Sequence, residues 1–255
     1  MIKKPSIQST VLYGLLGIAL GVQAKDWPAP IKALEARGVE VLGSFAAPSG
    51  LTGYAGMMAQ QPLAIYLTAD GKQAIIGSMI DAKGVDLSEE PLNRLVSKPM
   101  TEKVWKQLEG STWIADGARN APRIIYTFTD PNCPYCNKFW NDARPWVTIG
   151  KVQVRHIMVA VLGPTSPGKA AAILSAPDPQ AALTQHQQQR GSGGVKPLAQ
   201  ISPPVRAQLD ANQQLMQQLG FSGTPATLYK DADGNLQTVA GAPSAEMLNR
   251  VLGPR

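Results

Sequence analysis

The chain has few cysteines, and it has no concentration of charge or glycine that would indicate a nucleic-acid or nucleotide partner. Only two cysteines occur in 255 residues, too few for the disulfide framework that staples many small secreted domains. The formal net charge is +6, but lysines and arginines are scattered and form no run with interleaved aromatic residues, which argues against nucleic-acid binding. A glycine-rich phosphate loop is also missing. The function therefore has to be sought elsewhere.

The only long apolar run lies at the N-terminus and is too short to span a bilayer. Residues 11–22 are uncharged and largely apolar, whereas a membrane-spanning helix needs about 20 such residues. Lys3 and Lys4 precede this run, and Val22-Gln23-Ala24 follows it, which is typical of a cleaved secretory signal. We interpret residues 1–24 as a signal peptide, with the mature chain starting near Lys25 and no stable membrane insertion after cleavage. An uncleaved anchor is the alternative.

The mature chain, about 230 residues long, can hold one large domain or two modest ones. Residues 25–88 combine a helix with short strand-like runs, and Asp70-Gly71 predicts a hairpin between two of the strands. Such a small antiparallel α+β unit of about 60 residues is marginal alone, so we expect it to pair with a second copy. Residues 89–112 are polar and helix-prone, typical of a linker helix, with Pro99 as an interruption.

From residue 113 onward the pattern changes to α/β. Residues 123–129 form a β-prone run typical of a buried central strand; a helix from Cys133 and a second apolar strand at 152–162 follow. This order predicts a βαβ unit with a parallel strand pair. We expect Pro145 to end or kink the helix. Residues 164–220 predict a helical insertion, after which two strands and a last helix complete a catalytic domain over residues 113–255.

The sequence Cys133-Pro134-Tyr135-Cys136 directly follows the predicted central strand and opens the helix. In that position the thiol of Cys133 meets unpaired amide N–H groups and the positive end of the helix dipole, which favour a thiolate. We therefore predict that Cys133 is a nucleophile. Cys136, one turn further into the helix and less exposed, is the expected resolving cysteine. Pro134 and Tyr135 are expected to tune the redox potential.

Metal binding is the main alternative use of two cysteines. Structural zinc takes four ligands, and the two histidines, His156 and His186, lack paired spacing. We expect no metal, and we interpret both histidines as ordinary core or surface residues. The acids in residues 231–235 resemble part of a calcium loop, but the rest of that pattern is missing, so we predict a plain hairpin turn.

A second motif, Gly223-Thr224-Pro225-Ala226, precedes a predicted strand. Together with the cysteine pair it resembles the thioredoxin superfamily, in which a cis-proline at such a position lies beside the active-site disulfide and helps to bind substrate. The resemblance implies that Pro225 is cis and that Thr224 and Pro225 bind substrate; an ordinary trans turn proline is the alternative.

Thr127 stands where thioredoxin has a buried acid, so proton transfer at Cys136 would need water or another group.

Over the whole mature chain the sequence resembles the DsbC/DsbG family of periplasmic disulfide isomerases. Residues 130–136, followed by Lys138-Phe139-Trp140 and by residues 143–147, are more similar to the DsbG branch, because the DsbC branch usually has Gly in place of Pro134. The resemblance implies an α+β N-terminal dimerisation domain, a linker helix and a thioredoxin-like domain with a helical insertion. It also implies a periplasmic homodimer that acts on misfolded or oxidised secreted proteins, is kept reduced by a DsbD-like membrane reductase, and needs no cofactor beyond its Cys133-Cys136 pair.

Two other functions stay open at this point. A monomeric DsbA-like oxidase would donate its disulfide, although the long N-terminal segment argues against a monomer. A non-catalytic holdase chaperone would bind unfolded chains without using the cysteines, and this property is also compatible with a redox role. The sequence does not distinguish misplaced disulfides from sulfenic acids as the main target.

Overall fold

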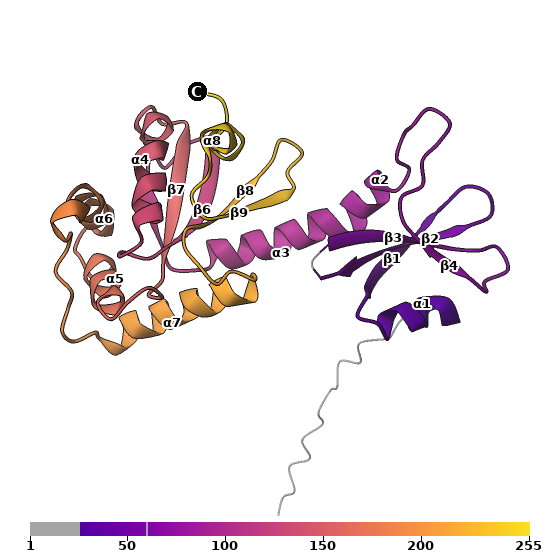
Figure 1. The fold of residues 1–255 in the computed structure, drawn as a ribbon, viewed down its shortest axis with the longest axis horizontal. Coiled ribbons are helices and arrows are strands. Elements are labelled where there is room, and N and C mark those ends of the chain that lie inside the picture. The colour runs from indigo at the N-terminus through magenta and orange to yellow at the C-terminus, as the bar shows by residue number, and fades with distance from the viewer. Residues whose placement is uncertain (1–25, 60) are drawn as a thin grey trace, which may run out of the picture.

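The computed structural model describes residues 26–59 and 61–255, which form two units joined by a helical segment (Figure 1). The predicted signal peptide and the predicted start of the mature chain at Lys25 lie outside the described residues. No helix within the described part of the chain combines the length and apolarity that a membrane span requires.

The N-terminal unit is an antiparallel four-stranded sheet with one helix beside it. Ile31 of the helix is fully buried against Tyr54 and Ile65 of the sheet, so the sheet and helix share one small core. Asp70-Gly71 lies in the hairpin between the last two strands, as predicted. The elements are α1 (Ala29–Glu35), β1 (Glu40–Ala46), β2 (Thr52–Met58), β3 (Gln61–Leu67) and β4 (Ala74–Ile76), with sheet order β1-β2-β3-β4.

Strand β2 was not predicted from the sequence, because two glycines interrupt its apolar pattern. Gly53 pairs with Phe45 of β1. A Cβ atom at position 53 would lie 2.2 Å from the Phe45 ring. This position therefore holds glycine because a neighbouring aromatic ring lies across it, not because the chain turns there.

The connection between the units is continuously helical, so Pro99 does not interrupt it. A wide π-helical turn precedes this proline, with the Lys98 N–H bonded to the Asn93 carbonyl. Such a turn accommodates a residue that has no N–H and whose ring would clash in a regular α-helix. Val104 and Leu108 then pack on the sheet of the C-terminal unit, while the π-helical turn contacts β1 and β2. The segment comprises α2 (Glu89–Leu92), the π-helical turn η1 (Asn93–Ser97) and α3 (Lys98–Glu109).

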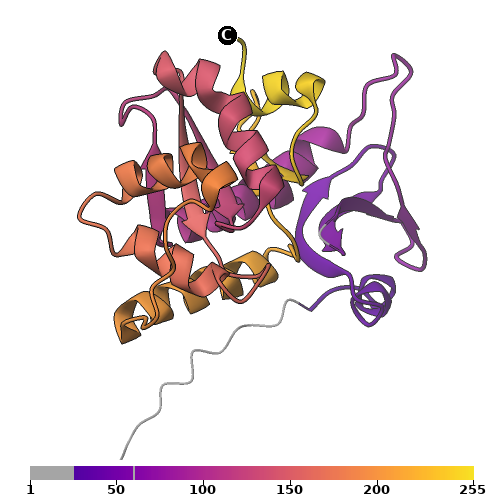
Figure 2. The same cartoon turned by 60° about the vertical axis from the view of Figure 1, so that its left-hand side comes forward.

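The C-terminal unit is a five-stranded sheet in the order β5-β7-β6-β8-β9, in which β6 and β7 are parallel, as predicted. Helices α4 and α8 pack on one face, and α3 and α7 pack on the other; in the turned view of Figure 2, α4 lies in front of the sheet. The strands are β5 (Trp113–Asp116), β6 (Arg123–Thr129), β7 (Val152–Met158), β8 (Ala226–Lys230) and β9 (Leu236–Ala240). The helices are α4 (Pro134–Thr148), α5 (Ser166–Leu174), α6 (Pro179–Gln188), α7 (Pro203–Gln218) and α8 (Ala245–Leu252), with a short 3-10 turn, η2 (Arg190–Ser192).

Two predicted boundaries in this unit were wrong. Of the two alternatives for Pro145, the end of the helix was wrong: α4 continues to Thr148, because Trp146 and Val147 are buried in the core and hold the last turn. Strand β7 ends at Met158 instead of residue 162. Beyond it the chain bends so that the Val161 and Leu162 N–H groups can donate to the Asp130 carboxylate.

Candidate active site

The turn between β6 and α4 places Cys133 at the N-terminal end of the helix. Cys133 occupies the capping position, with an extended backbone, and its Sγ accepts the Cys136 N–H at 3.1 Å. Pro134 follows as the first helical residue, where its lack of an N–H has no cost. The local sequence therefore directs a free amide of the helix toward the sulfur.

The second predicted motif lies directly opposite. The Thr224–Pro225 peptide bond is cis, and the Cys133 thiol donates a hydrogen bond to the Thr224 carbonyl at 3.2 Å. Residues 91 positions apart in the chain thus meet at one sulfur. The Thr224 hydroxyl is buried and has no hydrogen-bond partner of its own.

The two cysteines are equally buried, which differs from the expectation that Cys136 would be the less exposed. Each is 2% exposed, whereas Tyr135 between them is 62% exposed. The Thr224 carbonyl oxygen lies against the Cys133 sulfur. Both thiols are free in this structure, which therefore represents the reduced protein.

The two thiols have opposite pKa shifts. Hydrogen bonding from the Cys136 side chain, supported by the backbone N–H groups of Cys136 and Tyr135, lowers the pKa of Cys133 to about 6. Burial, together with the neighbouring Cys133, raises the pKa of Cys136. At pH 7 about nine-tenths of Cys133 is therefore thiolate, while Cys136 keeps its proton.

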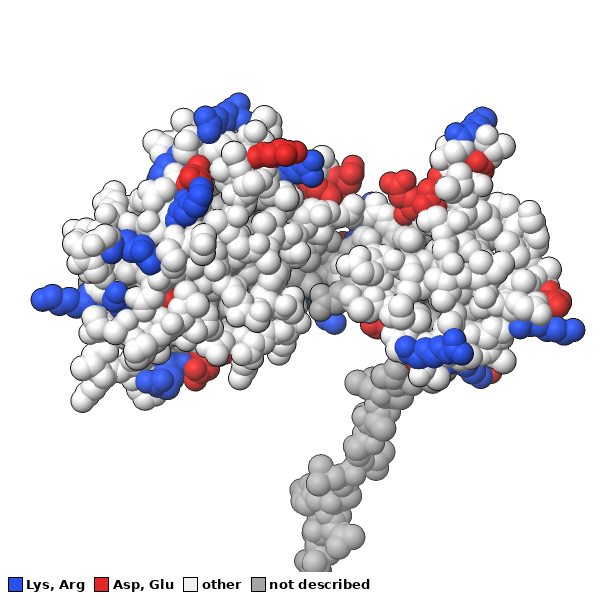
Figure 3. All heavy atoms as spheres, viewed as in Figure 1, with Lys and Arg blue, Asp and Glu red and all other residues white. Residues whose placement is uncertain are grey.

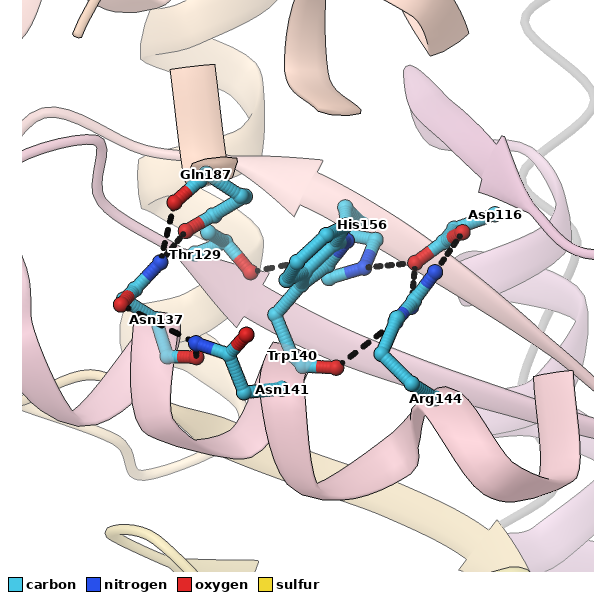
Figure 4. A network of polar contacts seen from close by, with 8 residues as sticks. All are labelled: Asp116, Thr129, Asn137, Trp140, Asn141, Arg144, His156 and Gln187. Atoms are coloured by element: carbon cyan, nitrogen blue, oxygen red, sulfur yellow. Dashed lines mark hydrogen bonds and ion pairs between the residues drawn. The ribbon is translucent and has the colours of Figure 1, made fainter. Parts of the chain in front are cut away.

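A polar cluster lies between α4 and the sheet (Figure 4). Arg144 of α4 forms a bidentate ion pair with Asp116 of β5, in which Nη1 donates to Oδ1 at 2.9 Å and Nη2 donates to Oδ2. His156 lies on the other side of this carboxylate. Its Nε2 is 3.5 Å from Asp116 Oδ2, at the limit of a hydrogen bond, and its Nδ1 is 2.9 Å from the Thr129 hydroxyl.

This cluster holds Asp116 ionised in the protein interior. Burial alone would raise the pKa of Asp116, but hydrogen bonds and charge from His156 and Arg144 lower it to about 2. The sequence analysis did not find this cluster, because Asp116, Thr129, Arg144 and His156 come from four separate elements. The bidentate partner of Arg144 lies 28 positions away in the chain, beyond any local spacing rule.

Thr127, at the position of thioredoxin's buried acid, is fully buried, and its hydroxyl lies 3.2 Å from that of Thr227. It therefore contributes a hydroxyl and no carboxylate to the space beneath α4. Any base that deprotonates Cys136 has to come from another position.

Neither histidine has the surroundings of a metal ligand. His186 donates from Nε2 to the Pro131 carbonyl at 2.7 Å, while its Nδ1 accepts the Val195 N–H at 3.1 Å. Across residues 26–59 and 61–255, no three His, Cys, Asp or Glu side chains gather as a metal site would require. In the loop at residues 231–235, Asp231 accepts two backbone N–H groups of the loop itself, which makes an ordinary turn.

Comparison with known proteins extends these observations. A thioredoxin-like domain model matches residues 114–253, and a model of the disulfide bond isomerase protein N-terminal domain matches residues 22–89. The thiol:disulfide interchange protein DsbG of Pseudomonas aeruginosa is 49% identical over 94% of both chains. DsbG of Escherichia coli is 40% identical over 90% of this chain and 93% of that protein. The solved catalytic domain of Proteus mirabilis ScsC, 24% identical, has a similar fold, with a TM-score of 0.52 over 61% of this chain and 96% of that domain.

Proposed function

Because this chain belongs to the DsbC/DsbG family of thiol:disulfide interchange proteins, we propose that Cys133 is its nucleophile and Cys136 its resolving cysteine. The protein is a thiol–disulfide oxidoreductase that isomerises or reduces disulfides. The observation that supports the two roles is the opposite shift of the two pKa values at one helix N-terminus. Only the Cys133 sulfur is available as a thiolate at neutral pH.

The reaction starts when the Cys133 thiolate attacks one sulfur of a substrate disulfide. A mixed disulfide forms, and the other substrate sulfur leaves as a thiolate. In isomerisation, a different substrate thiolate then attacks the substrate sulfur of the mixed disulfide, so a new substrate disulfide forms and Cys133 leaves as a thiolate. In reduction, Cys136 loses its proton and attacks the Cys133 sulfur, so the substrate leaves reduced and the enzyme keeps a Cys133–Cys136 disulfide. With a sulfenic acid as substrate, the first attack displaces hydroxide, which leaves as water.

The neighbouring residues have supporting roles in this proposal. Thr224 and Pro225 bind the substrate main chain beside the sulfur, because their loop covers Cys133 on its open side. Pro134 and Tyr135 tune the redox potential through the first turn of the helix. The exposed Tyr135 ring also offers apolar surface to a substrate next to the reacting sulfur.

We propose that residues 25–88 form a dimerisation unit, residues 89–112 the linker and residues 113–255 the catalytic domain, with its insertion at about 164–220. Strand β4 is a short edge strand whose Ile75 and Ile76 are more than half exposed, and Ile80 and Val85 in the next loop are equally exposed. An exposed apolar edge strand is a template for pairing with another chain. A second copy of this unit would bury these side chains.

Changing Ile75 to Lys together with Ile80 to Asp should convert the dimer into a monomer, because charges would have to be buried at the interface. Sedimentation velocity of the secreted protein measures the change directly. Ile149→Asp is the matched control, since Ile149 is 60% exposed on the catalytic unit and Ile80 is 63% exposed. A protein that is already monomeric before mutation, or dissociation in the control alone, would contradict this assignment.

We further propose that the protein acts in the periplasm on misfolded or oxidised secreted proteins, with a DsbD-like membrane reductase restoring its thiols. The N-terminal sequence of a secretory signal supports this location. Charged residues are scattered over the face shown in Figure 3, which suits polypeptide substrates better than nucleic acid. Electrons are carried by the two sulfurs, so the proposal includes no other cofactor. A holdase activity would accompany the redox reaction without replacing it.

Trapping of substrates tests this function. A Cys136→Ala protein, exported by its own signal, should accumulate mixed disulfides on Cys133, because the resolving thiol is missing. Non-reducing gels followed by mass spectrometry identify the captured proteins. A Cys133→Ser/Cys136→Ala double variant is the control and should capture none. Partners with several cysteines would indicate an isomerase, and partners with a single cysteine would indicate a reductase of sulfenic acids. A folded, exported Cys136→Ala protein that captures nothing would refute the assignment of the nucleophile.

A further inference from the structure

The turn that leads into Cys133 is held by side chains of the helical insertion. His186 of α6 donates to the carbonyl of Pro131, and Arg190 of η2 donates from Nη2 to the carbonyl of Asn132, each at 2.7 Å. These are the two consecutive carbonyls that immediately precede Cys133. The donors lie 55 and 58 positions further along the chain, so the contact joins the insertion to the catalytic turn.

The hydrogen-bond partners of His186 determine which ring nitrogen carries the proton. Nδ1 accepts the Val195 N–H at 3.1 Å, so in the neutral ring the proton is on Nε2 and points at Pro131. The side chain is buried, and burial lowers the pKa of His186, which favours the neutral ring. Gly194 has φ 66° and lies against this ring: a Cβ there would be 2.4 Å from Nδ1. The glycine-rich break in the insertion thus gives the histidine its space.

The carboxylate of the same turn is also bound by several donors. Asp130 is buried, and its Oδ1 accepts the Asn132 N–H at 2.7 Å and the Ser166 hydroxyl at 2.9 Å. Its Oδ2 accepts the N–H groups of the bend after β7. Lys169 of α5 donates to the Asn132 side-chain oxygen at 3.0 Å. The Asp130 carboxylate and the Asn132 side-chain oxygen thus accept hydrogen bonds from the insertion and from the bend after β7.

The orientation of these groups bears on Cys133, because a carbonyl directed at a thiolate repels it, whereas an N–H stabilises it. We propose that His186 and Arg190 are positioning residues, which hold the carbonyls of Pro131 and Asn132 away from Cys133 so that these two carbonyls do not repel its thiolate. This inference rests on the proposed role of Cys133 as the nucleophile. It gives the helical insertion a part in setting the reactivity of the cysteine.

The test is the pH profile of Cys133 alkylation by iodoacetamide in the reduced full-length protein, located by mass spectrometry. The unmodified protein should show a midpoint near pH 6. His186→Phe, which keeps a ring but removes the donor, should raise this midpoint by about one pH unit, so that about half of Cys133 is thiolate at pH 7. Because the reduced form loses this stabilisation, equilibrium with glutathione should shift toward the disulfide by roughly fivefold at pH 7.

Three further variants separate positioning from general loosening. Arg190→Met should raise the midpoint in the same direction, and it is less disruptive because Arg190 is only partly buried. His186→Gln, which keeps an N–H donor, should restore most of the original profile. Gln187→Met is the matched control: Gln187 is buried on the same helix and accepts from Asn137 of α4 at 2.8 Å, but it does not touch the two carbonyls.

Unchanged midpoints in folded His186→Phe and Arg190→Met proteins would overturn the proposal. An equal shift in Gln187→Met would also overturn it, because loosening of α4 alone would then suffice. Another result would refute the premise that Cys133 is an activated nucleophile. In that case the alkylation midpoint of the unmodified protein would lie near pH 8.5, as for an ordinary thiol. Substrate trapping by Cys136→Ala checks that premise independently.

Discussion

Replacing Cys133 by Ser should reduce disulfide reduction and isomerisation to the background of the assay. A serine hydroxyl stays protonated at neutral pH and cannot form a disulfide, so neither the first attack nor the mixed disulfide exists. Cys136 cannot substitute, because it is buried and its pKa is raised. The measurement is the rate at which the purified protein, with glutathione as reductant, reactivates a small enzyme carrying scrambled disulfides.

The same Cys133→Ser protein also distinguishes the redox role from a holdase role. Suppression of aggregation of a cysteine-free unfolded protein should persist in the variant, since it depends on apolar surface such as the exposed Tyr135 ring. Circular dichroism provides the folding control. Full reactivation of the scrambled enzyme by the variant would show that the cysteines matter little and would favour the chaperone as the main function.

The largest effect on stability should come from Asp116→Ala. The change leaves Arg144 without its bidentate partner and removes the carboxylate beside the buried His156. Removing one partner of a buried ion pair costs about 3–5 kcal/mol, and we expect about 3 kcal/mol because the Arg144 side chain is 28% exposed. Urea unfolding of the reduced protein measures the loss. The control is Asp142→Ala, which removes a surface pair with Lys138 on the same helix and should cost less than about 1 kcal/mol.

Acid should reveal the same interaction without mutation. The folded protein lowers the pKa of Asp116 from 3.8 to about 2, so its contribution to stability is complete above pH 4 and is lost as the pH falls from 4 to 2. The expected loss is about 2 kcal/mol over this interval. In Asp116→Ala the curve of unfolding free energy against pH should be flatter by that amount. Parallel curves for the two proteins would show that the carboxylate is not held ionised by its neighbours.

The parts of the molecule that could be predicted from sequence are those specified by local residues. The βαβ unit follows from the buried strand at residues 123–129 and the helix after it, and the hairpin of the N-terminal unit follows from Asp70-Gly71. The position of the cysteine pair at a helix N-terminus follows from the break Asp130-Pro131-Asn132. In each case the deciding residues lie within a few positions of one another, where propensity and pattern act directly.

What could not be predicted depends on residues that meet only after folding. Strand β2 could not be recognised in the sequence, because the Phe45 ring on the neighbouring strand leaves no room for a side chain at Gly53. The two buried histidines look alike in the sequence, yet one supports the cluster around Asp116 and the other binds the turn before Cys133. The helix persists through Pro145 because tertiary packing outweighs the local penalty of proline. Single-residue rules describe none of these contacts.

The helix between the units has a geometric consequence for the enzyme as a whole. One end is embedded against the N-terminal sheet and the other against the catalytic sheet, so the two bodies are joined by a rod and not by a flexible tether. Along such a rod each residue adds about 1.5 Å of length and about 100° of rotation. The number of residues in α3 therefore sets the direction in which Cys133 faces relative to the N-terminal sheet. Adding or removing one residue would rotate the Cys133 sulfur about the helix axis, although its distance from the N-terminal sheet would hardly change.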